Sequence, residues 1–285
     1  MMNVQVLSAK AATLRTLHKG SDPLILANVW DVAGARLIES LGFPAVATSS
    51  AAIANSLGYR DGERISREEM LSVVSRIAAS VNIPVSADIE GGYASAPEQM
   101  AETTRKLIEA GAVGLNLEDG EADRTRLTPI DRQVSKIAAL RAAAASAGVQ
   151  LVLNARTDAF WWKGADPKTR WADIVQRANA YREAGADSVF VPGMQKADDI
   201  ARFAKESPGP LNIIAFTGTP SIPELRRLGV VRVSVGPGPY RAALGLLKKI
   251  ANELREHGTY NGIAENALSP EEINQWFAAS QGGAR

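Results

Sequence analysis

Eight short apolar runs, each followed by an amphipathic stretch, constrain the fold of this chain more than any other feature. They are rich in Val, Ile and Leu, as expected for parallel strands that are buried on both faces. The segment EAGA precedes two of them, at 109–112 and 183–186, and its glycine is a typical helix stop. The eight runs lie at residues 24–29, 45–50, 84–89, 113–118, 151–156, 188–192, 212–216 and 230–235. This repeated strand–helix unit predicts a (β/α)₈ barrel rather than an open doubly wound sheet.

The chain reads as one domain over residues 1–285. No Pro/Ser-rich linker divides it, and no GxGxxG segment follows the first strand, which argues against a dinucleotide-binding sheet. After the eighth strand the sequence continues with the helical pattern RAALGLLKKIANELREHG and then SPEEINQWFAAS. We therefore expect a helical extension of the barrel from about residue 239 to residue 285.

Composition excludes several classes of function. The formal net charge of +1 leaves no electrostatic footprint for nucleic acid or an anionic membrane. The chain has no cysteine, which removes disulfides, thiolate nucleophiles and cysteine-based zinc sites. With only His18 and His257, a histidine-rich metal site is excluded as well. The first residues lack the apolar core of a signal peptide, and no apolar run is long enough to span a bilayer. We expect a cytoplasmic protein that acts on small molecules.

Charged side chains stand where three neighbouring strands end. Asp88 lies at the end of the third predicted strand and Glu90 just past it, Glu118 ends the fourth strand and Arg156 ends the fifth. In a barrel of this type the carboxyl ends of the strands carry the active site. Three carboxylates placed together repel one another unless a cation or a proton compensates them, and Mg²⁺ prefers oxygen ligands. The pattern predicts a Mg²⁺ site at the mouth of the barrel, although helix caps or surface ion pairs would use the same residue types.

Four segments together resemble one known family. In the order SLGYRDGERIS, ADIEGGY, LNLEDG and NARTDAF, they resemble the isocitrate lyase/phosphoenolpyruvate mutase superfamily, and the resemblance runs from about Ala27 to about Gly238. It implies a (β/α)₈ barrel whose last helix is often exchanged between subunits of a homodimer or homotetramer. It also implies Mg²⁺, with Mn²⁺ as a substitute, and the making or breaking of C–C or P–C bonds next to a 2-oxo acid.

The resemblance further assigns the metal site. It implies that Asp88 binds the metal directly and that Glu90 and Glu118 bind it through water, with Glu90 standing where Asp is more frequent. Asp61, in the GYRDG segment, matches a further acidic residue near the metal, although the same segment also reads as an ordinary turn.

The substrate contacts are assigned in the same way. Arg156 resembles the residue that clamps a substrate carboxylate, while a structural salt bridge to Glu118 or Asp88 is the alternative. Ser49, Ser50 and Ala51 match the turn that holds the other anionic end of the substrate, although these serines could also simply cap the next helix. We predict that Arg156, Asp61 and Ser49 are catalytic, and that Ser49, Ser50, Ala51 and Arg156 bind substrate.

One loop departs from the family pattern. The stretch EDGEADRTRLTPIDRQ has neither the Lys–Cys pair of the isocitrate and methylisocitrate lyases nor the Lys and Asn of the phosphonopyruvate-processing members. Arg124 or Arg126 is a candidate to replace these groups. We therefore expect a Mg²⁺-dependent carbon–carbon lyase for a small 2-oxo or 2-hydroxy dicarboxylic acid of the oxaloacetate or alkylmalate type, acting through a pyruvate-like enolate. Phosphonopyruvate chemistry and a barrel that binds 2-oxo acids without turnover are the alternatives.

Overall fold

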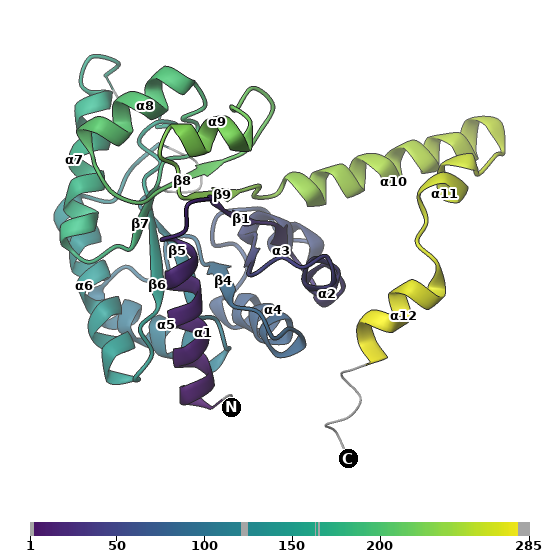
Figure 1. Ribbon diagram of the computed structural model, residues 1–285, viewed down its shortest axis with the longest axis horizontal. Helices are drawn as coiled ribbons and strands as arrows, with labels where there is room; N and C mark the ends of the chain where they lie inside the picture. Colours follow the sequence, from purple (N-terminus) through teal and green to yellow (C-terminus); the bar gives the residue numbers. More distant parts are fainter. Residues whose placement is uncertain (1–2, 121–124, 163, 165, 279–285) are drawn as a thin grey trace.

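A computed structural model describes residues 3–120, 125–162, 164 and 166–278 of the chain. Within these residues a parallel sheet curls into a nearly closed barrel with helices around it (Figure 1). Its strands are β1 Leu24–Leu26, β2 Asn28–Val29, β3 Val46–Thr48, β4 Val85–Asp88, β5 Gly114–Glu118, β6 Val152–Arg156, β7 Ser188–Phe190, β8 Leu211–Ile214 and β9 Arg232–Ser234. All eight predicted strands are confirmed, and the first of them is divided into β1 and β2 at Ala27. The predicted α/β barrel is therefore the observed fold.

The barrel closes where the first predicted strand is divided. The order of the sheet is β1-β9-β8-β7-β6-β5-β4-β3-β2, so its two edges are consecutive pieces of chain. The side chain of Asn28 joins these edges at the carboxyl end. Its amide nitrogen donates to the carbonyl of Thr48 at 2.8 Å, and its oxygen accepts from the backbone N–H groups of Val235 and Gly236 at 2.9 and 2.7 Å.

Helices α2 to α9 lie outside the sheet between successive strands, where their sequences predict them, and α1 precedes the first strand. The two EAGA segments end α5 and α7 as expected, and paired side chains cap the starts of α4 and α9, with Ser66 bonded to Glu69 and Ser221 to Glu224. The helices before the C-terminal extension are α1 Val4–Leu17, α2 Val32–Ser40, α3 Ser50–Ser56, α4 Arg67–Ser80, α5 Pro97–Glu109, α6 Ile130–Ser146, α7 Arg170–Glu183, α8 Ala197–Glu206 and α9 Ile222–Arg227.

The interior of the barrel is unusually polar beneath its carboxyl end. Asn154 donates to the side-chain oxygen of Asn116 at 2.9 Å and accepts from Ser188 at 2.6 Å. Arg232, which is fully buried, donates to Asn116 and Ser86 at 3.2 Å each. With its oxygen occupied by these donors, the amide nitrogen of Asn116 is the group left to face the mouth of the barrel. The polar interior thus orients side chains at the strand ends.

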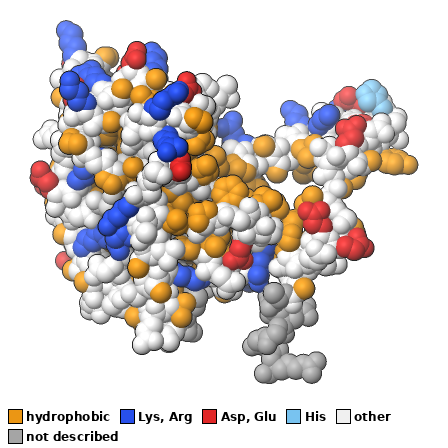
Figure 2. Space-filling view, viewed as in Figure 1, with side chains coloured by type: hydrophobic (Ala, Val, Ile, Leu, Met, Phe, Trp, Pro, Cys, Tyr) orange, Lys and Arg blue, Asp and Glu red, His pale blue; other side chains and the backbone are white. Residues whose placement is uncertain are grey.

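The last three helices form an arm that leaves the barrel. They are α10 Gly238–His257, α11 Asn261–Asn266 and α12 Pro270–Ala278. Helix α10 extends away from the barrel and α12 returns beside α2 (Figure 1). No residue of α10 is buried, and Figure 2 shows hydrophobic side chains along the arm and on the flank of the barrel that faces it. Helices make up most of the described part of the predicted extension. None of the described helices is both long and apolar enough to cross a membrane.

Candidate active site

Strand register brings the predicted site residues together at one end of the barrel. Asp88 is the last residue of β4 and pairs in register with Asn116 of β5. Glu118 and Arg156 end β5 and β6 and are register partners. Ser49 and Ser50 follow β3 at the start of α3. Because all these strands are parallel, their last residues face the same opening.

Asp88 is held by donors on both of its oxygens. Oδ2 accepts from the backbone N–H of Ser50 at 3.0 Å and from its hydroxyl at 2.7 Å, while Oδ1 accepts from the amide of Asn116 at 3.3 Å. Three donors fix the direction of the carboxylate. Ser50 therefore positions Asp88 in this structure. The neighbouring hydroxyl of Ser49 accepts from the N–H of Ala52 at 3.4 Å and caps α3.

Glu90 is a buried carboxylate with one unpaired oxygen. Its Oε2 accepts from the backbone N–H of Glu63 at 2.6 Å, whereas its buried Oε1 has no partner among the described residues. Its backbone φ of 52° lies in the left-handed region, where a non-glycine residue is strained. Burial, followed by the negative charges of Asp61 and Asp88, raises the pKa of Glu90 to about 8.

Arg156 stands between two carboxylates. Its Nη1 lies 2.6 Å from Glu118, and its Nε and Nη2 form a two-pronged contact with Asp158 at 2.7 and 2.9 Å. The alternative reading of Arg156, a salt bridge to Glu118, is thus realised in this structure. Burial raises the pKa of Glu118 despite the opposing effect of Arg156. Asp158, which sequence reasoning did not assign, anchors the guanidinium at the mouth of the barrel.

Asp119 has a structural role. Its side chain is buried and accepts from the hydroxyl of Tyr181 at 2.6 Å, from Arg177 at 3.1 Å and from the backbone N–H of Asp158 at 2.9 Å. These contacts tie the end of β5 to α7 and to the segment after β6.

The predicted substrate residues line one cavity of about 520 Å³ at the mouth of the barrel. Ser49, Ser50, Ala51, Asp61, Asp88 and Arg156 all contribute to it, so the structure brings together six of the eight predicted site residues. We refer to this space as the main cavity. Its lining also includes Arg241, the fourth residue of α10, which is exposed and which sequence reasoning missed. A lone arginine in an amphipathic helical pattern gave no signal of this position.

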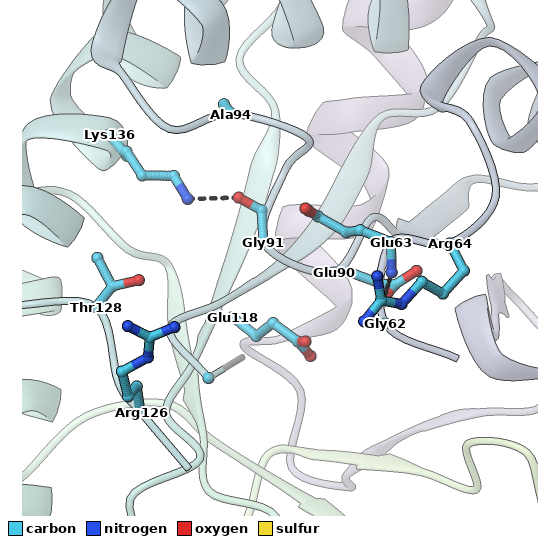
Figure 3. Close-up of a pocket in the computed structure, with 11 residues that line it drawn as sticks. Gly62, Glu63, Arg64, Glu90, Gly91, Ala94, Glu118, Arg126, Thr128 and Lys136 are labelled. Atoms are coloured by element: carbon cyan, nitrogen blue, oxygen red, sulfur yellow. Dashed lines mark hydrogen bonds between the residues drawn. The ribbon is translucent and has the colours of Figure 1, made fainter. Parts of the chain in front are cut away.

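Glu90 and Glu118, the other two predicted residues, line a second cavity of about 530 Å³, which we call the side cavity. Figure 3 shows three cationic side chains around the carboxylates in this side cavity, namely Arg64, Arg126 and Lys136. Lys136 reaches from α6 to donate to the carbonyl of Gly91, and burial lowers its pKa. Arg126, predicted as a possible loop cation, does lie beside the site, whereas Arg124 falls outside the described residues.

Comparison with known proteins identifies the family. A family model described as phosphoenolpyruvate phosphomutase matches residues 14–255. The chain belongs to the isocitrate lyase/phosphoenolpyruvate mutase superfamily. The 2-methylisocitrate lyase of Aeropyrum pernix is 30% identical over 271 residues, covering 91% of this chain and 84% of that protein. An uncharacterised protein of Mycobacterium tuberculosis is 35% identical over 228 residues, covering 80% of this chain and 83% of the other.

A solved structure supports the same placement. A crystal structure from Burkholderia cenocepacia, provisionally assigned as a lyase/mutase, is 38% identical with a TM-score of 0.89, and the match covers 96% of this chain and 97% of that one. Members of the superfamily are lyases or mutases, and membership supports an enzyme of this class. The expected family is therefore confirmed, while the comparisons leave the substrate open.

The superfamily implies a Mg²⁺ ion, and the carboxylates fit one in chemistry. Asp88, Glu90 and Glu118 offer oxygen donors, and the unpaired buried Oε1 of Glu90 is an acceptor in need of a cation or a proton. Burial, followed by the charges of neighbouring carboxylates, raises the pKa of Glu90 and Glu118, and a divalent cation would favour their ionised forms. As they stand, no three acidic or histidine side chains in the described part of the chain converge as a complete coordination set. The metal assignment to these three residues stays a prediction.

Proposed function

We propose that this protein is a Mg²⁺-dependent carbon–carbon lyase that acts on a small 2-oxo or 2-hydroxy dicarboxylic acid. One observation carries the proposal: the main cavity is lined by the carboxylate of Asp88 and by two guanidinium groups, those of Arg156 and the exposed Arg241. A cavity of about 520 Å³ lies within the usual range for small-molecule sites and has room for an acid of four to seven carbons. The two guanidinium groups match the two carboxylates of a dicarboxylic acid substrate.

Each residue has a distinct role in this proposal. Asp88, with Glu90 and Glu118 behind it, would hold Mg²⁺, which when bound stabilises negative charge on the oxygen atoms of the substrate. Arg156 binds the carboxylate next to the 2-oxo or 2-hydroxy group, because a planar guanidinium matches a carboxylate. The hydroxyl of Ser49 and the backbone N–H of Ala51 bind the other anionic end of the substrate.

Arg241 binds the second carboxylate of the substrate. It comes from α10 and lines the main cavity. Asp61 lines the same cavity, and Asp61 and Asp88 are the two acidic side chains in its lining. We assign the proton transfers to Asp61, since Asp88 accepts three hydrogen bonds and is held in place.

The reaction balances without an oxidant or reductant. In a 2-hydroxy diacid the hydroxyl proton leaves, the C2–C3 bond breaks and its electron pair remains on C3, which then takes up a proton. The products are a 2-oxo acid and a saturated carboxylic acid. In an oxaloacetate-type substrate the C3–C4 bond breaks instead, C4 leaves as CO₂, and the electron pair forms the enolate of pyruvate, which is then protonated. Both routes place negative charge where cationic groups line the cavity.

Product analysis tests the proposal. Oxaloacetate, alkylmalates, methylisocitrate and phosphonopyruvate should be incubated with the protein in Mg²⁺ and in EDTA, and pyruvate, glyoxylate and phosphate measured. We expect metal-dependent 2-oxo acid from a carbon diacid, lost at least 100-fold in Asp88→Asn and kept in the exposed control Asp198→Asn. A carbon diacid cleaved equally well by Asp88→Asn, or in EDTA, would contradict the proposal.

Phosphonopyruvate chemistry is the rival that the matching family model favours by its description. It would break a P–C bond and leave the enolate of pyruvate in the same cavity. Phosphate or phosphoenolpyruvate formed from phosphonopyruvate, with no turnover of carbon diacids, would replace the lyase proposal. Binding of 2-oxo acids with no product from any compound would instead indicate a binding protein.

We also propose that the arm is exchanged with a second copy of this chain in a homodimer or homotetramer. Helix α10 has no buried residue, and its leucines, such as Leu247 with 60% of its surface exposed, face solvent within a single chain. Exposed apolar surface of this kind is typical of an interface. Sedimentation analysis should give a dimer or tetramer that Leu247→Glu dissociates and the neighbouring control Lys248→Glu does not. A monomeric wild-type protein would refute the exchange.

A further inference from the structure

The main cavity has two unlike sides. The ends of β3 to β6 supply hydrogen-bonding and charged groups, namely Ser49, Ser50, Asp88, Asn116 and Arg156, whereas the segment after β6 and the ends of β7 and β8 supply most of the hydrocarbon. We define the hydrocarbon wall as Trp161, Phe190, Pro192, Ile214 and Phe216. Phe190 and Ile214 are the last residues of β7 and β8, and Pro192 and Phe216 follow each of them by two positions. A site for a plain dicarboxylic acid would need no such wall.

The wall is built by close packing around two glycines. A Cβ atom on Gly193 would overlap the indole nitrogen of Trp161, so the absence of a side chain there lets the indole take its place. A Cβ atom on Gly236 would lie 2.6 Å from the terminal methyl of Ile214. Both positions place an apolar group against bare backbone, which fixes the shape of the wall.

The wall meets the charged side of the cavity at Arg156. The guanidinium carbon lies 5.7 Å from the ring centre of Phe190 and 5.8 Å from that of Trp161, so both rings hold the cation in place. A substrate whose carboxylate contacts Arg156 therefore has hydrocarbon beside it on this side.

These apolar residues are not simply part of the helix-facing core. Successive side chains of a strand point to opposite faces. Ile213 and Val189 belong to the cluster that packs with the outer helices through Phe203 and Ile200. Their neighbours Ile214 and Phe190 point inward and line the main cavity. Water against this inward surface would be displaced favourably by hydrocarbon.

We propose that the substrate carries an alkyl group of two to four carbons on C3, the carbon that keeps the electron pair of the cleaved C2–C3 bond. The hydrocarbon wall binds this alkyl group. The inference rests on the proposed lyase function and names its substrate class. For a 3-alkylmalate the products are glyoxylate and the acid RCH₂COOH, and with a methyl group on C2 the first product is pyruvate. The hydroxyl proton is lost and C3 gains one, so the cleavage is balanced.

A ligand series that cannot be cleaved tests the wall separately from the chemistry. Succinate and its 2-methyl, 2-ethyl and 2-propyl derivatives lack the hydroxyl group and can be titrated by calorimetry in Mg²⁺. Each buried methylene contributes about 0.8 kcal/mol, so Kd should fall about four-fold per added carbon up to propyl. A flat series, or weaker binding with each carbon, would overturn the inference.

Two neighbouring residues of β8 provide a matched pair of variants. Ile214→Val removes one methylene from the wall, so the derivative with the lowest Kd should have one carbon more than for the wild-type protein. The side chain of Ile213 points to the outer helices, so Ile213→Val should leave the order of the Kd values unchanged. Equal effects of both variants would count against the wall. If the alkyl series binds as expected and no alkylmalate is cleaved, the wall stands and the lyase proposal fails.

Discussion

Magnesium binding should release protons at neutral pH, because Glu90 is protonated in the metal-free protein. Its pKa of about 8 means that about nine-tenths of the molecules carry this proton at pH 7. A cation bound at the carboxylate favours the ionised form, so the proton must leave. The release from Glu90 should therefore be about 0.9 proton per Mg²⁺ at pH 7.

Calorimetry measures this release directly. The heat of Mg²⁺ binding at pH 7 is compared in PIPES and in Tris, and the difference divided by the difference in buffer ionisation heat gives the protons released. Mg²⁺ affinity should also rise about ten-fold per pH unit up to about pH 8 and then level off. Glu90→Gln should lower the release by about 0.9 proton, and the exposed control Glu98→Gln should not. Mg²⁺ binding with equal heats in both buffers would refute the reasoning.

Three further predictions concern stability and substrate binding. Burial and the charge of Arg232 lower the pKa of His18 to about 4, so the neutral ring contributes stability that is present above pH 6.5 and lost as the pH falls toward 4. In urea unfolding, the free energy of unfolding should fall by about 2 kcal/mol between pH 7 and pH 5. This fall should disappear in His18→Gln and persist in the control His257→Gln. An equal fall in both variants would count against the role of His18. Tyr181→Phe removes one donor from buried Asp119 and should cost about 1–3 kcal/mol in the same assay, and a cost below about 0.5 kcal/mol would contradict this role. Arg241→Met should raise the Kd for succinate at least ten-fold and leave Mg²⁺ binding unchanged, and an unaltered Kd would exclude Arg241 as the second carboxylate contact.

The fold was accessible from the sequence because each strand is a short apolar run bounded by recognisable helix ends. Residues 188–190, for example, are buried on both faces and are preceded by a glycine stop. The helical pattern after the last strand predicts the arm, whereas nothing in that pattern gives the direction in which α10 leaves the barrel. The break of the first strand at Ala27 is a consequence of closing the sheet, and no local pattern marks it.

The candidate site was accessible where residues end strands and hidden where they come from elsewhere. Asp88, Glu118 and Arg156 share one opening because parallel strands align their carboxyl ends. Lys136 and Arg241 reach the cavities from helices, and a cation in an amphipathic helix is usually a solvated residue. The ion pair between Arg156 and Asp158 was hidden as well, because nothing in the segment NARTDAF shows that these two side chains contact each other.

The ion pair between Glu118 and Arg156 links the two ligands that the site is proposed to bind. In the empty protein each charge satisfies the other at 2.6 Å. A cation that engages Glu118 frees Nη1 of Arg156 for a carboxylate, while Nε and Nη2 stay with Asp158 and keep the guanidinium in place. Breaking the pair is costly for either ligand alone, because one buried charge is then left without its partner. Each ligand should therefore strengthen the binding of the other by the same factor, as linkage requires. Titrating succinate, which has no 2-oxo group to chelate the metal, with and without Mg²⁺ measures this factor, and a value of one would show that the pair stays closed.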